Sequence, residues 1–297
     1  MSTNPYYFVS KGSITMTKLR LMSHNQWKCD QNLPDWEKIG ADCSAEVRVR
    51  GFVRVYKDTL PDVIGCQEVS ATMADYLVRY AAEEGLHYAL LWGRDTPILY
   101  RPDKFELVDS AFALYPDEFP GHEGIFNNDQ TKSWNLAVFR VKESGKLFIF
   151  VSTHLWWKSG NPAAKNYQPY SAEARAYQIG LVSEKIREYQ AKYACPAVLV
   201  GDLNSGYGSL AIDRAFREGF RHAHDLATDY ADESCGLHEC FGWGYYNYYN
   251  DAPFPASIDH ILIKDAPEGF VRRYERFSPE YYLPLSDHSP AIADVEF

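Results

Sequence analysis

Residues 197–204 read Ala-Val-Leu-Val-Gly-Asp-Leu-Asn and join a short apolar run to two polar side chains. The run 197–200 is typical of a strand that is buried on both faces. In extended backbone Asp202 and Asn204 leave from the same face, because side chains alternate along a strand. A carboxylate and an amide placed in this way can hold one water molecule and one phosphate oxygen. The alternative is a local turn in which both side chains bond only the backbone.

Similar apolar blocks, bounded by turn residues, recur on both sides of this run. They predict further strands at 19–22, 63–65, 98–100, 148–152 and 258–263. Helical spacing of apolar residues predicts helices at 45–56, 73–81 and 179–189, and a short one from a Ser209 cap to Gly219. Strands and helices do not alternate regularly, and hairpin-like strand pairs occupy the region around 105–155. We therefore expect two packed sheets with helices outside them.

Polar side chains stand at the ends of these predicted strands, where a rigid sheet can hold them while loops leave them accessible. In chain order the motifs are Asn25, Gln67-Glu68, Thr153-His154-Leu155, Gly201-Asp202-Leu203-Asn204, Ile258-Asp259-His260 and Ser286-Asp287-His288-Ser289-Pro290.

Three of these positions carry residue types that suit phosphoryl chemistry. Glu68 is a hard oxygen ligand directly after a buried strand and suits Mg²⁺, although a solvated surface glutamate is the simpler alternative. A histidine that acts as an acid or base needs an orienting carboxylate, and Asp259 is the candidate for His288. His260 should point to the opposite face of its strand from Asp259, so we expect it to be structural.

In this order the motifs resemble the endonuclease/exonuclease/phosphatase superfamily, which includes the DNase I-like nucleases and the inositol-polyphosphate phosphatases. The resemblance covers roughly residues 19 to 297. It implies an α/β fold, a four-layer αββα sandwich of two packed mixed sheets. It also implies a Mg²⁺ or Mn²⁺ site at one edge of the paired sheets.

The resemblance assigns a role to each motif. It makes Glu68 the principal metal ligand, with Asn25 and Asp287 in or near its coordination shell. His154 is similar to the histidine that donates a hydrogen bond to the phosphate, and a core histidine is the alternative. The pair of His288 and Asp259 acts as general base or orients the phosphate. The same resemblance favours the catalytic role of Asp202 and Asn204 over the local turn. No Tyr or Arg is assigned to the phosphate, and Arg94, Tyr100, Arg101, Trp134 and Asn135 are candidates.

The implied activity is metal-dependent hydrolysis of a phosphate ester by water, on a small molecule or on nucleic acid. The alternatives are a DNA or RNA endonuclease or exonuclease of the same superfamily, and a degenerate module that only binds. The presence of the whole polar set argues against a binding module, which needs no such set. A zinc hydrolase is disfavoured because there is no H-x-x-x-H spacing and the expected ligands are oxygen atoms.

Composition bears on the substrate. Thirty Lys and Arg against forty Asp and Glu give a net charge of −10, which disfavours a general polyanion binder. It does not exclude a nuclease, because bound cations can supply positive charge locally. Trp156 and Trp157, and the aromatic residues of 241–249, could stack on a base or sugar of the substrate; packing between sheets is the alternative.

The remaining expectations concern organisation. We predict one domain over 19–297 after an N-terminal extension, 1–18, and mostly reduced cysteines, with Cys235 and Cys240 around His238 a weak metal-clip signal. No apolar stretch approaches the ~20 residues that span a bilayer, and the first residues do not resemble a signal peptide. A cytoplasmic protein without a membrane span is therefore expected. The sequence predicts no oligomeric state.

Overall fold

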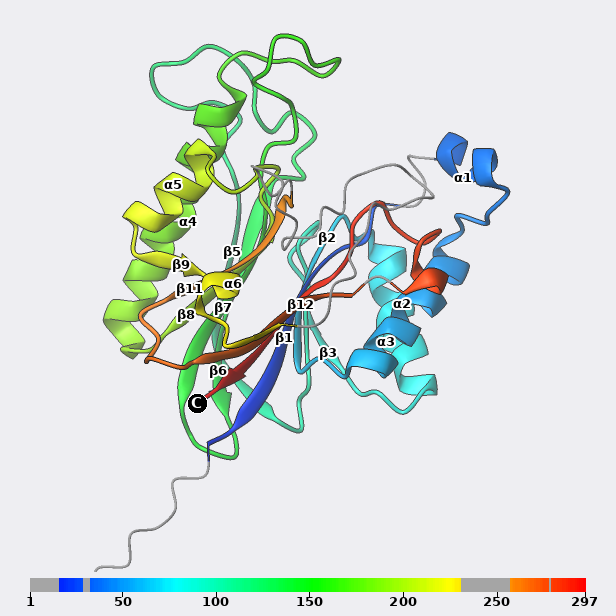
Figure 1. The fold of residues 1–297 in the computed structure, drawn as a ribbon, viewed down its shortest axis with the longest axis vertical. Helices are drawn as coiled ribbons and strands as arrows, with labels where there is room; N and C mark the ends of the chain where they lie inside the picture. Colours follow the sequence, from blue (N-terminus) through cyan, green and yellow to red (C-terminus); the bar gives the residue numbers. More distant parts are fainter. Residues whose placement is uncertain (1–15, 29–32, 231–256, 278) are drawn as a thin grey trace, which may run out of the picture.

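The computed structural model describes residues 16–28, 33–230, 257–277 and 279–297, which form a sandwich of two mixed sheets (Figure 1). The first sheet has the order β10 (Asp229–Tyr230), β12 (Val271–Arg276), β13 (Ala291–Glu296), β1 (Lys18–Asn25), β2 (Val63–Gln67), β4 (Ile98–Tyr100) and β3 (Ala89–Leu91). The second has the order β5 (Phe105–Leu114), β6 (Ser133–Val141), β7 (Leu147–His154), β8 (Ala197–Asp202), β11 (Asp259–Lys264) and β9 (Phe220–His222).

Helices form the two outer layers. Figure 1 shows α2 (Ala45–Thr59) and α3 (Ala71–Glu83) beside the first sheet, and α4 (Ser171–Tyr193) and α5 (Leu210–Arg217) beside the second. The shorter helices are α1 (Leu33–Ile39), α6 (Ala223–Leu226) and a 3-10 turn, η2 (Glu280–Tyr282). The predicted four-layer αββα sandwich is confirmed.

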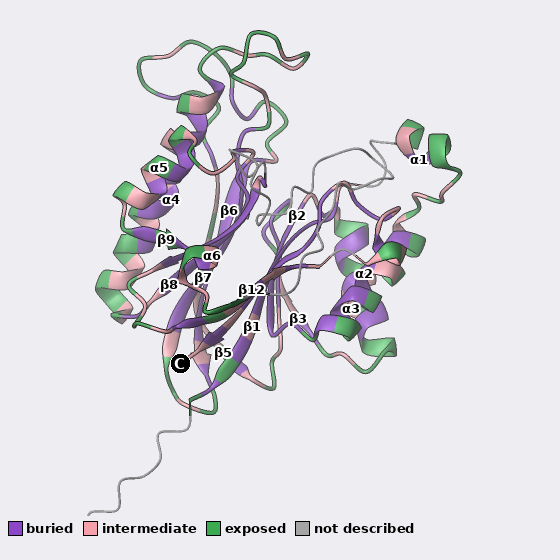
Figure 2. Cartoon of the chain, viewed as in Figure 1, coloured by how far each residue is buried: buried purple, intermediate pink, exposed green. Residues whose placement is uncertain are grey.

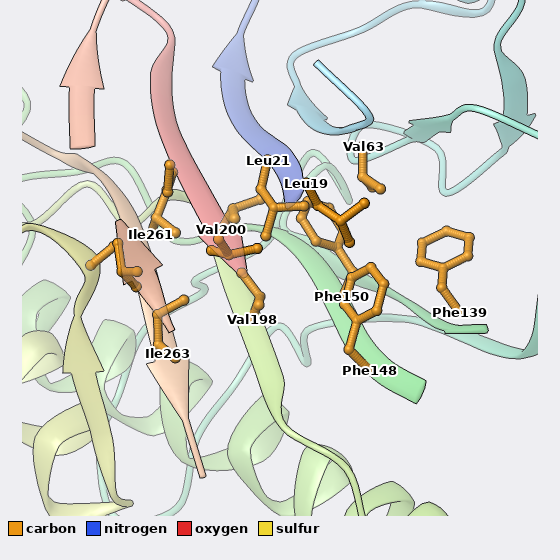
Figure 3. Packing of buried hydrophobic residues seen from close by; sticks show 14 of the residues in the cluster. Leu19, Leu21, Val63, Phe139, Phe148, Phe150, Val198, Val200, Ile261 and Ile263 are labelled. Atoms are coloured by element: carbon orange, nitrogen blue, oxygen red, sulfur yellow. The ribbon is translucent and has the colours of Figure 1, made fainter. Parts of the chain in front are cut away.

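Strand alternation explains the layering. Leu21 of β1 and Phe150 of β7 point into the core between the sheets (Figure 3), whereas Met22 and Ile149 point outward to the helices. Central strands are buried and the outer helix faces are exposed (Figure 2). Gly65 allows a close approach of the two sheets, since a Cβ there would lie 2.4 Å from Cγ2 of Val200.

Strand register brings the polar strand ends to one end of the sandwich. In the second sheet, parallel β7 and β8 place His154 opposite Asp202, and antiparallel β11 places Asp259 opposite the same Asp202. In the first sheet, parallel β1 and β2 place Asn25 opposite Gln67. Since β1 also packs on β8, the two sets of side chains face each other across the sandwich.

Several expectations fall outside the described residues. These are residues 1–15 of the predicted extension, the Cys235 and Cys240 pair, and the aromatic residues of 241–249. The domain boundaries therefore stay a prediction, with β1 beginning at Lys18. Cys43, Cys66 and Cys195 are free thiols. None of the helices in the described ranges combines the length and the apolar character needed to cross a membrane.

Candidate active site

The backbone is unusual where it presents the polar motifs. Glu68, directly after β2, and Asn204, after β8, have φ values of 56° and 47°, in the left-handed region. Gly201 has φ of 155°, and a Cβ on it would lie 1.9 Å from the carbonyl oxygen of Thr153. Asp202 can therefore leave β8 beside β7 only because glycine precedes it. Strained backbone of this kind is frequent at functional sites.

One group of side chains bridges the two sheets. Nδ2 of Asn25 donates to Oδ2 of Asp202 at 2.9 Å and to Oε1 of Glu68 at 3.4 Å. Nε2 of His154 lies 3.4 Å from the same Asp202 oxygen and 3.8 Å from Oε1 of Glu68. The structure thus brings together four predicted site residues from four strand ends.

A second group of side chains also lies beside Asp202. Nδ1 of His288 lies 2.7 Å from Oδ2 of Asp259, which is the predicted orienting contact. Nε2 of His288 lies 3.9 Å from Oδ2 of Asp202 and 3.7 Å from Oδ1 of Asp287. Asp202 therefore joins both groups into one site.

Asn204 makes local contacts. Its backbone N–H donates to Oδ1 of Asp202 at 2.8 Å, and its Nδ2 donates to the carbonyl of Leu155 at 3.1 Å. The Asx-type turn considered as an alternative is therefore present. The turn does not remove Asp202 from the site, because it uses only one carboxylate oxygen, Oδ1. The other oxygen, Oδ2, faces Asn25 and His154.

Burial and crowding shift the acidities of these groups. Burial, and then the charges of Glu68 and Asp202, raise the pKa of Asp287 well above its ordinary value. Burial and the Asp202 charge likewise raise the pKa of Asp259, and burial lowers the pKa of His288. Burial would also raise the pKa of Asp202, but hydrogen bonding to His154 and the nearby histidine charges lower it below its usual range. Carboxylates that compete in this way favour a shared cation.

Two clusters in the site could hold a metal ion. Glu68, His154 and Asp202 form one, and Asp202, Asp259 and His288 form the other; the ligand atoms of each lie within 4.8 Å of one another. Oδ1 of Asp259 and Oδ1 of Asp287 are buried without a hydrogen-bond donor among the described residues. Orphaned carboxylate oxygens fit a hard cation, because such cations prefer oxygen ligands.

Comparison with known proteins agrees with the geometry. A sequence model of the endonuclease/exonuclease/phosphatase family matches residues 36–288. The chain belongs to this family. The matched range contains every predicted site residue except Asn25, which precedes it. No curated protein matches the sequence.

Solved structures of the same fold resemble the chain over nearly its full length. An endonuclease/exonuclease/phosphatase from Bacteroides vulgatus is 23% identical over 94% of this chain and 98% of its own, with a TM-score of 0.69. A mannosyl-6-phosphatase from Bacteroides thetaiotaomicron is 19% identical over 93% and 98%, with a TM-score of 0.66. TDP2 from D. rerio, complexed with a single-strand DNA product, is 19% identical over 94% and 98%, with a TM-score of 0.61.

Within this family fold, the structure adds residues that sequence reasoning missed. Nδ1 of His154 lies 3.2 Å from Oδ2 of buried Asp95, and Nζ of Lys28 lies 2.5 Å from the other Asp95 oxygen. Nζ of Lys132 lies 2.9 Å from Nε2 of His154. These residues come from loops without apolar periodicity. The only sequence signal for these three residues is a charged side chain among turn residues.

The new neighbours set the acidity of His154. Burial and the charge of Lys132 lower its pKa, but hydrogen bonds to Asp202 and Asp95 outweigh them and raise it to about 9. Burial would raise the pKa of Asp95, and the hydrogen bond to His154 with the charges of His154 and the two lysines lowers it to about 2.

Four of the candidates for the missing phosphate contact lie elsewhere. Tyr100 packs against Phe139 between the sheets, and Arg101 pairs with Asp103 at 2.6 Å. Trp134 is buried in the core on the helix side of the second sheet. Nδ2 of Asn135 donates to the carbonyls of Leu91 and Thr96, at 3.0 and 3.2 Å. Asn135 therefore holds the loop that carries Asp95, and Arg94 in the same loop is exposed.

The two predicted stacking residues have different surroundings. Trp156 is 0% exposed and packs in a small cluster with Phe119, Phe126 and Ala174, so no face is open to a substrate. The substrate-binding role predicted for Trp156 is therefore corrected to packing. Trp157 is 43% exposed and keeps an open surface. His260 is buried as expected, and its Nε2 lies 2.7 Å from the carbonyl oxygen of Ser205.

Proposed function

We propose that this protein hydrolyses phosphate esters with a bound Mg²⁺ or Mn²⁺. The observation that carries the proposal is the convergence of Asn25, Glu68, His154, Asp202, Asp259, Asp287 and His288 on one end of the sandwich. A protein that only bound its partner would have no need for buried carboxylates this close together, since each raises the cost of charging its neighbours.

Glu68 and Asp287 would hold the cation. Glu68 is partly exposed, and Oδ1 of Asp287 is buried without a donor among the described residues. Asn25 would lie in or near the coordination shell, and it also orients Glu68 and Asp202 through its Nδ2. Its Oδ1 accepts from the backbone N–H of Trp27 at 2.9 Å. When bound, the cation supplies Lewis-acid stabilisation of the phosphoryl oxygens.

The protein's own groups act on the water and the phosphate. His288, oriented by Asp259, acts as general base or phosphate-orienting group, and Asp202 with Asn204 positions the water. His154 would donate a hydrogen bond from Nε2 to a phosphate oxygen, in place of its 3.4 Å contact with Asp202. Hydrolysis forms a bond between the water oxygen and phosphorus and breaks the bond to the ester oxygen. A proton of the water goes to the base and the leaving oxygen takes up a proton.

The substrate that we favour is a small phosphate ester, such as a sugar phosphate. The net charge of −10 supports it, because nucleic-acid binding gains most of its affinity from Lys and Arg contacts to phosphates. Exposed Trp157 could stack on a ring of the substrate. The structural relatives include both a mannosyl-6-phosphatase and a DNA-bound protein, so they do not separate a small ester from nucleic acid.

Hydrolysis of p-nitrophenyl phosphate and bis(p-nitrophenyl) phosphate tests the proposal, with Mg²⁺, Mn²⁺ or chelator. Glu68→Gln and His288→Ala should each lower kcat/KM on the order of 100-fold or more, as removal of a group acting in the transition state does. Glu46→Gln is the matched control, because Glu46 is an exposed glutamate on α2. Turnover that survives chelator, or that Glu68→Gln leaves intact, would contradict the proposal. If these esters and oligonucleotides all remain uncleaved, the chain is a binding module.

A further inference from the structure

Lys132 has a rigidly held backbone immediately before β6. Its N–H donates to Oδ1 of Asn127 at 2.8 Å, and Nδ2 of Asn127 donates back to the carbonyl of Lys132 at 2.9 Å. The same Nδ2 donates to the carbonyl of Tyr115 at 2.7 Å. Asn127 is fully buried, so this clamp fixes where the lysine side chain starts.

The ammonium group of Lys132 is aimed into the candidate active site. Ser133, the next residue, pairs with His154 across β6 and β7. Nζ of Lys132 lies 2.9 Å from Nε2 and 3.3 Å from Nδ1 of His154. Lys132 is only 4% exposed, although lysine is among the residues that are least often buried.

No carboxylate among the described residues lies within ion-pair distance of this buried cation, although its charge still helps to lower the pKa of Asp95. The two ring nitrogens of His154 already face carboxylates, Nδ1 towards Asp95 at 3.2 Å and Nε2 towards Asp202 at 3.4 Å. Each ring nitrogen has one hydrogen-bonding direction, so His154 cannot also satisfy the three donors of an ammonium group. Lys28, in contrast, has its own partner in Asp95, at 2.5 Å.

A buried ammonium group that forms no ion pair costs folding free energy, and such groups persist where a ligand completes them. The missing ligand must be an anion with several acceptor oxygens, and it must lie beside His154. A phosphoryl group meets both conditions, and the compact ammonium charge of lysine is suited to phosphate.

We propose that Lys132 is a substrate-contacting residue whose ammonium donates to a non-bridging oxygen of the phosphoryl group that is hydrolysed. The inference rests on the proposed function and deepens it. It supplies the phosphate contact for which the sequence offered no residue. It also explains how an acidic protein binds an anion: Lys132 places positive charge among the carboxylates of the site.

The test compares Lys132→Met with Lys146→Met. Lys146 is exposed in the turn that joins β6 and β7, so the control removes the same charge from the same hairpin. In the metal-loaded protein, Lys132→Met should lower kcat/KM for p-nitrophenyl phosphate on the order of 10- to 100-fold, the usual effect of losing a charged hydrogen bond. The inhibition constant for inorganic phosphate should rise by a similar factor. Lys132→Arg should retain part of the activity and part of the affinity for phosphate. Lys146→Met should change neither kcat/KM nor the inhibition constant.

Thermal unfolding separates this role from a structural one. Without phosphate, Lys132→Met should melt at the same temperature as the parent or higher, because a buried charge with no carboxylate at ion-pair distance among the described residues is replaced by an apolar chain of similar length. A lower melting temperature together with an unchanged inhibition constant for phosphate would overturn the inference. So would inhibition by phosphate that stays within twofold of the parent.

Direct binding keeps this inference separate from the proposed function. If the parent protein hydrolyses no ester, the proposed function fails, and calorimetric titration with inorganic phosphate still tests Lys132. Weaker phosphate binding by Lys132→Met than by Lys146→Met would support the contact. Equal binding by the two variants would overturn it.

Discussion

At the residue scale, the site depends on backbone conformations that few side chains tolerate. Gly201→Ala would place a Cβ against the Thr153 carbonyl, at a φ of 155° that L residues rarely adopt. We expect it to reduce the free energy of unfolding by about 1–3 kcal/mol and to displace Asp202, with a large loss of kcat. Gly145→Ala is the matched control, because Gly145 also has positive φ but nothing lies within 4 Å of a Cβ there. Urea unfolding and turnover of both variants check this, and similar losses in the two would contradict it.

At the element scale, α2 holds together the two loops that flank the site. Buried Arg48 of α2 donates through Nε to the carbonyl of Leu285 at 2.7 Å and through a second nitrogen to the carbonyl of Gln26. Gln26 directly follows Asn25 at the end of β1, and Leu285 precedes Asp287 and His288 in the other loop. The guanidinium also lies 4.4 Å from the centre of the Trp36 ring in α1.

Arg48→Met should therefore loosen both loops at once. We expect a loss of about 1.5–3 kcal/mol in unfolding free energy, from losing hydrogen bonds made by a charged group. We also expect the Mg²⁺ or Mn²⁺ concentration for half-maximal turnover to rise, because the ligands lose their fixed positions. Arg50→Met serves as control, since Arg50 is exposed on the same helix and bonds Glu46 and Glu83. An unchanged metal requirement in folded Arg48→Met would show that α2 does not position the ligands.

The same scale shows what the sequence could predict. Strands such as β7 and β8 were recognisable because their residues are apolar on both faces, and α5 because Ser209 caps it and Gly219 follows it. The polar motifs were recognisable because they follow those strands directly. Lys132 and Asp95 were missed because they lie in loops, and their position depends on long-range contacts such as the Asn127 clamp. Trp156 was misassigned because a local sequence does not show which side of a loop the core covers.

At the scale of the whole molecule, buried neutral histidines link stability to pH. Burial, and then the charge of Arg48, lower the pKa of His24 to about 3, and burial lowers that of His260 to about 4. Burial also lowers the pKa of His222 well below its ordinary value. The unfolded chain takes up protons near pH 6.5, whereas the folded protein does not. This contribution to stability is fully present above pH 6.5 and is lost as the pH falls towards 4.

His24 offers the sharpest test of this dependence. Its ring nitrogens lie 2.9 and 3.0 Å from the hydroxyls of Tyr56 and Tyr282. A neutral imidazole can hydrogen-bond to both hydroxyls in the protein interior. Between pH 7.5 and 5.5 each such histidine should reduce the unfolding free energy by about 1.4 kcal/mol. His24→Gln should be less stable than the parent at pH 7.5, because two buried hydroxyls lose their fitted partner, but its loss on acidification should be smaller by about 1.4 kcal/mol. Chemical unfolding at both pH values, with chelator present so that metal binding does not contribute, measures the difference. His87→Gln, at an exposed position, should lose as much unfolding free energy on acidification as the parent. If His24→Gln also loses as much as the parent, His24 takes up a proton inside the folded protein.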